Sequence, residues 1–312
     1  MKFAFVFPGQ GSQSVGMMNG YTDLPKIHDT FAEASEILGQ DFWAMVNDGP
    51  ADDLNLTVNT QPLMLMAGVA VYRAWSELGG AKPTFLAGHS LGEYTALVAA
   101  EALSFEDALK LVRFRAQVMQ QAVPEGVGGM AAILGLDDNI IEAVCTEITN
   151  NTDNESLEPA NFNSPGQVVI AGHKNAVLKG IELAKEKGAK RAVMLPMSIP
   201  SHCALMHPAA QEMQKQLEQL TLNTPTIPVL HNVDAKNHND IAAIKDILVK
   251  QLYSPVRWVD TIRSLAAAEV THIAECGPGK VLAGLNKRID KNLQSVSLTD
   301  NETVRQAISE LK

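Results

Sequence analysis

The sequence has few of the residues that build metal sites or disulfide frameworks. Only three cysteines occur in 312 residues, and no two have the CxxC spacing of a zinc site; they are Cys145, Cys203 and Cys276. The eight histidines form no HExxH motif. His202 and His207 are five residues apart and followed by Pro208, so one helical face cannot present both. We therefore expect no bound metal.

Long apolar runs and excess positive charge are also missing. The longest apolar stretches, such as residues 64–71, are too short to span a bilayer. The N-terminal run stops at Pro8-Gly9, earlier than a secretory signal would, so it is interpreted as a strand. A formal net charge of -10 disfavours general binding to nucleic acid or anionic lipid. These absences predict a globular cytoplasmic protein that binds neither nucleic acid nor membrane.

Short apolar runs alternate with amphipathic stretches along most of the chain. The runs predict strands at 3–7, 84–88, 228–232, 271–276 and 295–298, and the stretches predict helices at 62–78, 91–100, 105–122, 207–220, 241–252, 258–268 and 281–290. Pro62 and Pro208 are expected in first helical turns, and Ser104 is expected to begin a capping box. This alternation is typical of an α/β fold with a mostly parallel sheet covered on both faces.

Residues 128–198 break this alternation. The pattern there is strand 130–134, helix 137–149, strands 157–163 and 167–172, helix 175–187 and strand 191–197. That β-α-β-β-α-β order is the ferredoxin-like unit. We predict an α/β-hydrolase-like large domain of residues 1–127 and 199–312, with a ferredoxin-like subdomain of residues 128–198 inserted into it.

A G-x-S-x-G motif, Gly88-His89-Ser90-Leu91-Gly92, joins a predicted strand to a predicted helix. This turn strains the serine and exposes its Oγ, and the helix N-terminus behind it favours developing negative charge. A five-residue pattern also recurs by chance, but the strand before it and the helix after it argue against that explanation. Ser90 is the predicted nucleophile of an enzyme that moves acyl groups.

An oxyanion hole and a general base are expected near this serine. The Gly-rich loop 8–13 follows the first strand and offers the backbone N–H of Gln10, while the residue after the nucleophile offers that of Leu91. Alone, the loop could bind phosphate, although it lacks the lysine of a P-loop. His202 lies where the chain returns from the subdomain, a suitable place for a base in a cleft. A lone histidine is as often structural, and its rival His89 points elsewhere on the turn.

Arg115 is an unusual residue within an apolar helical stripe, because its neighbours three and four positions away are Leu111, Val112, Val118 and Met119. A buried arginine needs an anionic partner. One interpretation is a structural ion pair with a buried acid, and the other is a bidentate receptor for a substrate carboxylate. The sequence leaves both open.

These motifs, with others in order along nearly the whole chain, resemble the malonyl-CoA:acyl-carrier-protein transacylase family. The matching pieces are FVFPGQGSQ at 5–13, TQP at 60–62, GHSLGEY at 88–94, VRFRAQVMQ at 112–120, NFNSPGQVVIAG at 161–172, PSHCALM at 200–206, QLYSPVRW at 251–258 and GPGKVL at 277–282. The resemblance implies transfer of malonyl from malonyl-CoA to the phosphopantetheine thiol of acyl carrier protein in fatty acid biosynthesis, through a malonyl-Ser90 intermediate. It also implies a monomer without a bound cofactor, because CoA and the pantetheine arm are substrates.

The resemblance also assigns roles to residues. It implies a dyad of Ser90 and His202, an oxyanion hole from the backbones of Gln10 and Leu91, and a malonyl carboxylate on Arg115. It further implies that the backbone carbonyl of Gln251 orients the histidine, with no triad carboxylate. Five positions match residues that line the family's pocket: Gln61, His89, Met119, Asn161 and Asn163.

Three other interpretations share some of these features. An esterase or thioesterase of the α/β-hydrolase type has the same elbow but uses the triad order Ser, Asp/Glu, His, and it has no need of the inserted subdomain or Arg115. An acyltransferase of a polyketide pathway would use another extender unit. A scaffold without chemistry would bind the carrier and need none of the intact site residues. Candidates for the carrier-docking surface are Lys187, Lys190, Arg191, Lys287 and Arg288.

Overall fold

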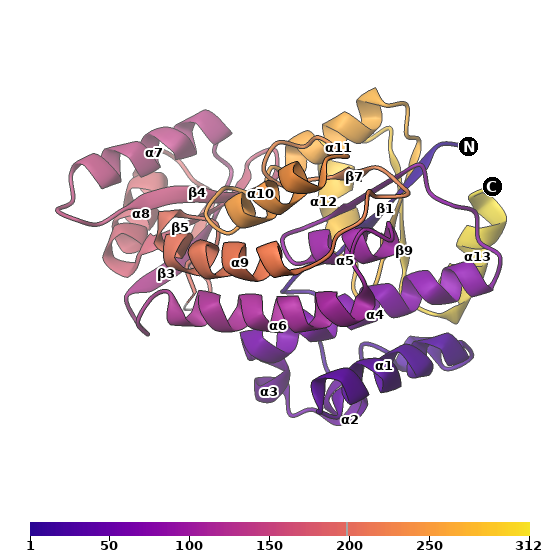
Figure 1. The fold of residues 1–312 in the computed structure, drawn as a ribbon. Coiled ribbons are helices and arrows are strands. Elements are labelled where there is room, and N and C mark those ends of the chain that lie inside the picture. Colours follow the sequence, from indigo (N-terminus) through magenta and orange to yellow (C-terminus); the bar gives the residue numbers. More distant parts are fainter. Residues whose placement is uncertain (198) are drawn as a thin grey trace.

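The computed structural model of the protein describes residues 1–197 and 199–312, and it contains two β-sheets (Figure 1). Ser198, the predicted last residue of the subdomain, lies outside the described residues. The chain ends lie together, and the N-terminal amine of Met1 donates a hydrogen bond to the carbonyl of Lys312 at 2.9 Å. Within the described ranges no helix has the length and apolarity to cross a membrane.

The larger sheet has five strands, all parallel, in the order β7-β2-β1-β8-β9. Their bounds are β1 Phe3–Phe7, β2 Phe85–Gly88, β7 Val229–Leu230, β8 His272–Cys276 and β9 Gln294–Leu298. The central strand β1 is buried throughout, which its continuous apolar sequence FAFVF favours. The α/β class with a mostly parallel sheet is thereby confirmed.

Helices cover both faces of this sheet because successive β1 side chains point to opposite faces. Phe3, Phe5 and Phe7 belong to one apolar core, while Ala4 and Val6 belong to another. The first core is closed by α1 (Pro25–Leu38), α2 (Phe42–Asp48), α3 (Ala51–Asn55), α4 (Thr57–Glu77), α5 (Gly92–Ala99), α6 (Phe105–Gln121), α9 (His207–Gln219), α10 (Ile241–Gln251) and α13 (Asn301–Glu310). The second is closed by α11 (Trp258–Ala267) and α12 (Val281–Ile289).

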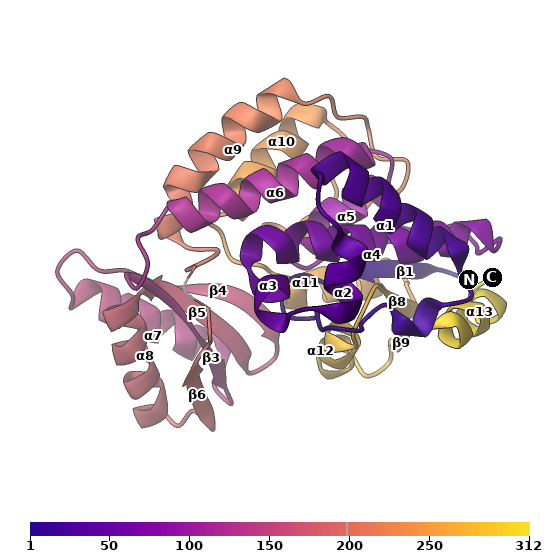
Figure 2. The ribbon, with the colours of Figure 1, turned by 90° about the horizontal axis from the view of Figure 1, so that it is seen from below.

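The smaller sheet is antiparallel, with the order β4-β5-β3-β6 that a ferredoxin-like unit requires. Its elements are β3 Gly128–Leu134, α7 Asp138–Asn150, β4 Leu157–Ser164, β5 Gln167–His173, α8 Lys174–Glu186 and β6 Arg191–Met194. The two helices pack on one face, away from the parallel sheet (Figure 2). The predicted fold of this insertion is confirmed, while its boundaries at 127/128 and 198/199 stay a prediction.

The edge strand β4 ties the small sheet to the large domain. The N–H of Phe162 donates to the carbonyl of Val256 at 2.9 Å, and the N–H of Val256 donates to the carbonyl of Ala160 at 2.9 Å. The two segments thus form a short parallel bridge between Asn161 and Val256. This contact places the end of β4 beside the carboxyl ends of the parallel strands.

Some local predictions are confirmed, one is confirmed in part and one is wrong. Pro208 lies in the first turn of α9, as predicted. Ser104 caps α6, because its hydroxyl accepts from the N–H of Asp107 at 3.0 Å, but the predicted capping box is only half formed: the Asp107 carboxylate accepts from the Ser104 hydroxyl at 2.7 Å and not from its backbone N–H. Pro62, however, lies inside α4, which begins five residues earlier at Thr57. Burial of almost every side chain from 59 to 71 outweighs the hydrogen bond that a proline removes. The periodicity also missed α1, α2, α3 and α13.

Candidate active site

Ser90 occupies a sharp turn between β2 and α5, with a φ of 50°. That conformation is costly for a residue with a side chain and is held by its surroundings. A Cβ added to Gly92 would lie 2.0 Å from the carbonyl oxygen of Phe7, and one added to Gly9 would lie 2.5 Å from that of His89. Glycine at both positions lets the turn press against β1 and the loop after it. The elbow predicted from the motif is therefore present.

His202 faces the serine from a buried position, with only 2% of its surface exposed. The hydroxyl of Ser90 lies 2.8 Å from Nε2, and Nδ1–H donates to the backbone carbonyl of Gln251 at 2.7 Å. That second bond selects the tautomer whose Nε2 lone pair faces the hydroxyl. Among the described residues no carboxylate hydrogen-bonds to this ring. The geometry is that of a nucleophile and a base without a third acidic member.

The environment keeps the base unprotonated. Burial, and to a smaller extent the positive charge of Arg115, lower the pKa of His202 to about 3. The hydrogen bond to the Gln251 carbonyl opposes both effects only in part. At neutral pH the imidazole is thus neutral and able to accept the serine proton.

Gln10 and Leu91 line the same cavity as Ser90, and their backbone N–H groups are the predicted oxyanion donors. Over the part of the chain that the structure describes, neither group donates to an acceptor of the protein. The N–H of His89 donates to the carbonyl of Phe7 at 3.0 Å, which joins the elbow to the loop after β1. Two donors without acceptors beside the nucleophile are what an oxyanion hole requires.

Arg115 projects from α6 into the site with 1% of its surface exposed. Nη1 donates to Oε1 of Gln61 at 2.8 Å, and Nη2 donates to Oε1 of Gln251 at 3.0 Å and to Oγ of Ser90 at 3.3 Å. These acceptors are neutral, and in residues 1–197 and 199–312 no carboxylate pairs with the guanidinium. Burial lowers the pKa of Arg115. The structural ion pair with a buried acid, one of the two interpretations of this residue, is therefore not seen among the described residues.

One cavity of about 640 Å³ between the parallel sheet and the subdomain contains most of the predicted site residues. Ten of them line it: Gln10, Gln61, His89, Ser90, Leu91, Arg115, Met119, Asn161, Asn163 and His202. Gln251 does not reach it and is fully buried behind Ser90. The rival base His89 hydrogen-bonds through Nε2 to Oδ1 of Asn163 at 2.7 Å, and that contact links the elbow to β4.

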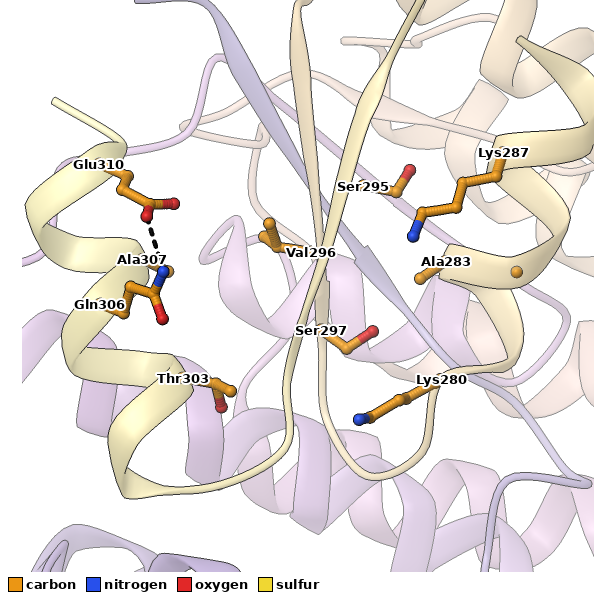
Figure 3. A pocket seen from close by; sticks show the side chains of 11 residues that line it. Lys280, Ala283, Lys287, Ser295, Val296, Ser297, Thr303, Gln306, Ala307 and Glu310 are labelled. Atoms are coloured by element: carbon orange, nitrogen blue, oxygen red, sulfur yellow. Dashed lines mark hydrogen bonds between the residues drawn. The ribbon is translucent and has the colours of Figure 1, made fainter. Parts of the chain in front are cut away.

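A second hollow of about 460 Å³ lies on the outer side of β9, between α12 and α13 (Figure 3). Lys280 and Lys287 border it on one side of the strand, and Gln306 and Glu310 border it on the other (Figure 3). Its lining contains no histidine or cysteine. Over the described ranges no three histidine, cysteine, aspartate or glutamate side chains are grouped so as to hold a metal. The serine–histidine pair lies in the larger cavity, not in this hollow.

Two residues that the sequence analysis did not select hold the nucleophile in place. Oδ1 of Asn232 accepts from the N–H of Ser90 at 2.7 Å, and Glu93 accepts from the N–H of Asn232 at 3.0 Å. Asn232 follows β7, and residues at the carboxyl ends of parallel strands commonly face the ligand. That rule could have indicated it. Glu93 had one signal, a lone acid in the first turn of an otherwise apolar helix.

Comparison with known proteins agrees with this geometry. The profile of the acyl transferase domain family matches residues 4–303. The malonyl CoA-acyl carrier protein transacylase of Salmonella typhimurium is 52% identical over 310 residues, which cover 99% of each chain. The crystal structure of an acyl-carrier-protein S-malonyltransferase from Burkholderia pseudomallei is 57% identical, with a TM-score of 0.97 and coverage of 99% of this chain and 100% of that one. A malonyl-transacylase solved in complex with its type II PKS acyl-carrier protein is 47% identical, with a TM-score of 0.97 and coverage of 99% and 100%.

The buried position of His202 predicts an unusual titration. The ring should stay neutral from pH 8 to pH 5 in the folded protein and take up a proton only toward about pH 3. In the unfolded chain it protonates near about 6.5. The unfolded state therefore binds more protons between these values, and this site makes stability fall as the pH falls through that window.

The measurement is an NMR pH titration of histidine ring signals, with His202→Ala to assign the resonance. Arg115→Ala removes the second cause of the shift and should move the midpoint upward. A midpoint near about 6.5 in the folded wild type would contradict this description.

Proposed function

The chain belongs to the malonyl CoA–acyl carrier protein transacylase family, and from this premise we propose that it performs its reaction through a covalent malonyl-Ser90 ester. The reaction is transfer of malonyl from malonyl-CoA to acyl carrier protein in fatty acid synthesis. One observation carries the proposal: a serine–histidine pair shares one cavity with a buried guanidinium that has no carboxylate partner among the described residues. An acyl group that ends in a carboxylate fits such a cavity.

In the first half-reaction, Nε2 of His202 takes the hydroxyl proton while Oγ of Ser90 attacks the thioester carbonyl. The oxyanion is stabilised by the N–H groups of Gln10 and Leu91, each worth about 10²–10³ in rate. The C–S bond then breaks, and the imidazolium returns its proton to the departing CoA thiolate. The products are free CoA and a malonyl ester on Ser90.

The second half-reaction repeats these steps with the other thiol. His202 takes the proton of the phosphopantetheine thiol, and the sulfur attacks the ester carbonyl on Ser90. Collapse of the intermediate breaks the C–O bond and restores the serine hydroxyl with the proton held by His202. Both thiols are substrates, so the chemistry needs no resident cofactor.

Arg115 is proposed to receive the malonyl carboxylate. Its guanidinium is already oriented by the two amide oxygens of Gln61 and Gln251, so little further ordering is needed when substrate binds. A planar guanidinium can offer a carboxylate two parallel charge-assisted hydrogen bonds. The side chains of Met119, His89, Asn161 and Asn163 are assigned as pocket lining.

The carrier protein is proposed to dock on exposed basic residues of both domains. Five exposed side chains contribute: Lys187, Lys190, Arg191, Lys287 and Arg288. Nη1 of Arg288 on α12 donates to Oε1 of Gln167 on β5 at 2.6 Å, and Gln167 lines the cavity. The phosphates of CoA and of the phosphopantetheine arm are anionic, and such residues attract them.

Ser90→Ala should fold normally and form no covalent malonyl-enzyme, because it removes the hydroxyl that lies 2.8 Å from Nε2 of the base His202. The measurement is the intact mass after incubation with malonyl-CoA, followed by addition of holo acyl carrier protein. In the wild type, transfer of malonyl from the Ser90 ester to the carrier protein supports the transacylase function. Rapid loss of the ester to water would indicate an esterase, and no adduct would indicate a non-catalytic scaffold. An adduct on another residue of the alanine variant would refute the assignment.

Arg115→Ala should lower kcat/KM for malonyl-CoA by about 10²-fold or more, as expected for a lost bidentate contact to a charged group, while acetyl transfer stays equal or improves. Acetyl lacks the carboxylate and leaves the wild-type guanidinium unpaired. Arg115→Lys should recover little, because an ammonium cannot reproduce the planar fork. The measurement is the malonyl/acetyl ratio of kcat/KM in all three proteins. An equal loss of kcat/KM for both substrates would show that Arg115 has only a structural role.

Arg288→Glu should raise KM for the carrier protein about 3- to 10-fold and leave kcat nearly unchanged, which is typical of reversing one exposed charge at a docking rim. Lys215→Glu is the matched control, since Lys215 is exposed on α9, well separated from α12 in Figure 2. Steady-state transfer is measured at low and moderate ionic strength. Equal effects of the two reversals would place the docking surface elsewhere.

A further inference from the structure

One carboxylate lies at the centre of the polar contacts behind Ser90. Glu93, the second residue of α5, is completely buried. Its Oε1 accepts from Nδ1–H of His231 at 2.7 Å, and its Oε2 accepts from the N–H of Asn232 at 3.0 Å and from Nε2 of Gln251 at 2.9 Å. A buried carboxylate is stable only when donors surround it in this way. Glu93 takes no part in the two half-reactions.

The side-chain amide of Gln251 connects this carboxylate to Arg115. Its Nε2 donates to Glu93 and to the backbone carbonyl of Ser90, both at 2.9 Å, and its Oε1 accepts from Nη2 of Arg115 at 3.0 Å. An amide has one donor end and one acceptor end. Turning it over would set its oxygen against two acceptors and its N–H groups against a guanidinium. Glu93, together with the carbonyl of Ser90, therefore determines which end meets Arg115.

The same carboxylate also anchors the residue that holds the nucleophile. The N–H of Asn232 donates to Glu93, while its side chain accepts from the N–H of Ser90 at 2.7 Å and donates to the carbonyl of Gly88 at 2.6 Å. These bonds satisfy the backbone on both sides of the strained turn. Two branches thus leave Glu93, one toward Ser90 through Asn232 and one toward Arg115 through Gln251.

The placement of the charges explains why an amide lies between Glu93 and Arg115. A carboxylate bonded directly to the guanidinium would occupy its donors and cancel its charge, and a substrate carboxylate would then have to displace it. The neutral amide of Gln251 transmits the orientation and leaves the charge available. The counter-charge of the buried arginine is kept one side chain away.

We propose that Glu93 is a positioning residue for malonyl selectivity, which acts by orienting the amide of Gln251 and, through it, the guanidinium of Arg115. The proposal rests on the proposed function, since it assumes that Arg115 receives the malonyl carboxylate. It predicts that removal of the negative charge at residue 93, with its shape kept, weakens recognition of malonyl more than recognition of acetyl.

The test is Glu93→Gln, assayed with malonyl-CoA and acetyl-CoA on the same preparation. A glutamine there has one acceptor oxygen for donors that now use two. It presents N–H either to His231, which can accept it by moving its own proton to the unbonded Nε2, or to Gln251, whose amide then turns at the expense of Arg115.

The malonyl/acetyl ratio of kcat/KM should fall about 10- to 100-fold, the size of a lost hydrogen bond to a charged group. The malonyl/acetyl ratio does not depend on the fraction of folded enzyme, because both substrates are assayed on the same preparation. A loss of activity that reaches Ser90 through Asn232 lowers kcat/KM for both substrates and cancels in the same way.

Glu275→Gln is the matched control. Glu275 is also a fully buried carboxylate, and it accepts only backbone N–H groups, those of Leu282 at 3.1 Å and Ala283 at 2.8 Å. It should lose stability and keep the wild-type ratio. Glu93→Asp retains the charge with a shorter reach; it should keep a ratio between those of wild type and Glu93→Gln, and it provides the comparison should the glutamine variant yield too little folded protein.

The outcomes separate this inference from the function on which it rests. A wild type that does not prefer malonyl over acetyl would refute the proposed function itself. A wild type that prefers malonyl, together with a Glu93→Gln ratio equal to that of Glu275→Gln, would overturn the positioning role alone. A ratio that falls in Glu93→Gln and is largely kept in Glu93→Asp supports it.

Discussion

The close approach of the serine turn to strand β1 is the constraint on which the rest of the site depends. Gly92 lies so near the carbonyl of Phe7 that no side chain fits between them. This contact brings the loop after β1, the turn after β2 and the residues after β7 to one edge of the sheet. Parallel strands present their carboxyl ends on the same side, so Gln10 and Leu91 line one cavity with Ser90, and the side chain of Asn232 reaches the N–H of Ser90 without long excursions of the chain.

The inserted subdomain completes this edge from the opposite side. Its sheet packs helices on one face, and Met130, Val169 and Ala171 on the other face cluster with the buried Cys203, next in the chain after His202. The bridge between Asn161 and Val256 fixes β4 relative to the large domain. The two domains thus enclose one cavity, and the residues that line it come from both.

Burial lowers the pKa of both basic groups of the site, but it changes the protonation state at neutral pH only of His202. Desolvation and the charge of Arg115 keep His202 neutral, so it can act as a base near pH 7. The guanidinium keeps its charge because amide oxygens and a nearby carboxylate compensate for lost water. Glu93 is the carboxylate joined to Arg115 through the amide of Gln251.

The sequence by itself determined the features that depend on neighbours along the chain. The glycines around Ser90, the Ser104 cap, the strand and helix order of the insertion and the apolar stripe around Arg115 are all local patterns. Residue types in order along the chain also indicated the family. Local periodicity misplaced the start of α4 at Pro62, because burial of the whole helix, a property of the assembled core, outweighs the preference of one residue.

Only the tertiary structure decided how the site's polar groups are paired. Ser90 and Asn232 are 142 positions apart, and Glu93 and Gln251 are 158 apart. Each of these side chains taken alone could be exposed to solvent or hydrogen-bonded to any of several partners, and no sequence pattern predicts which residues pair. A hydrogen bond depends on distance and direction within a few tenths of an ångström, and those are set only when the sheet, its helices and the subdomain pack together.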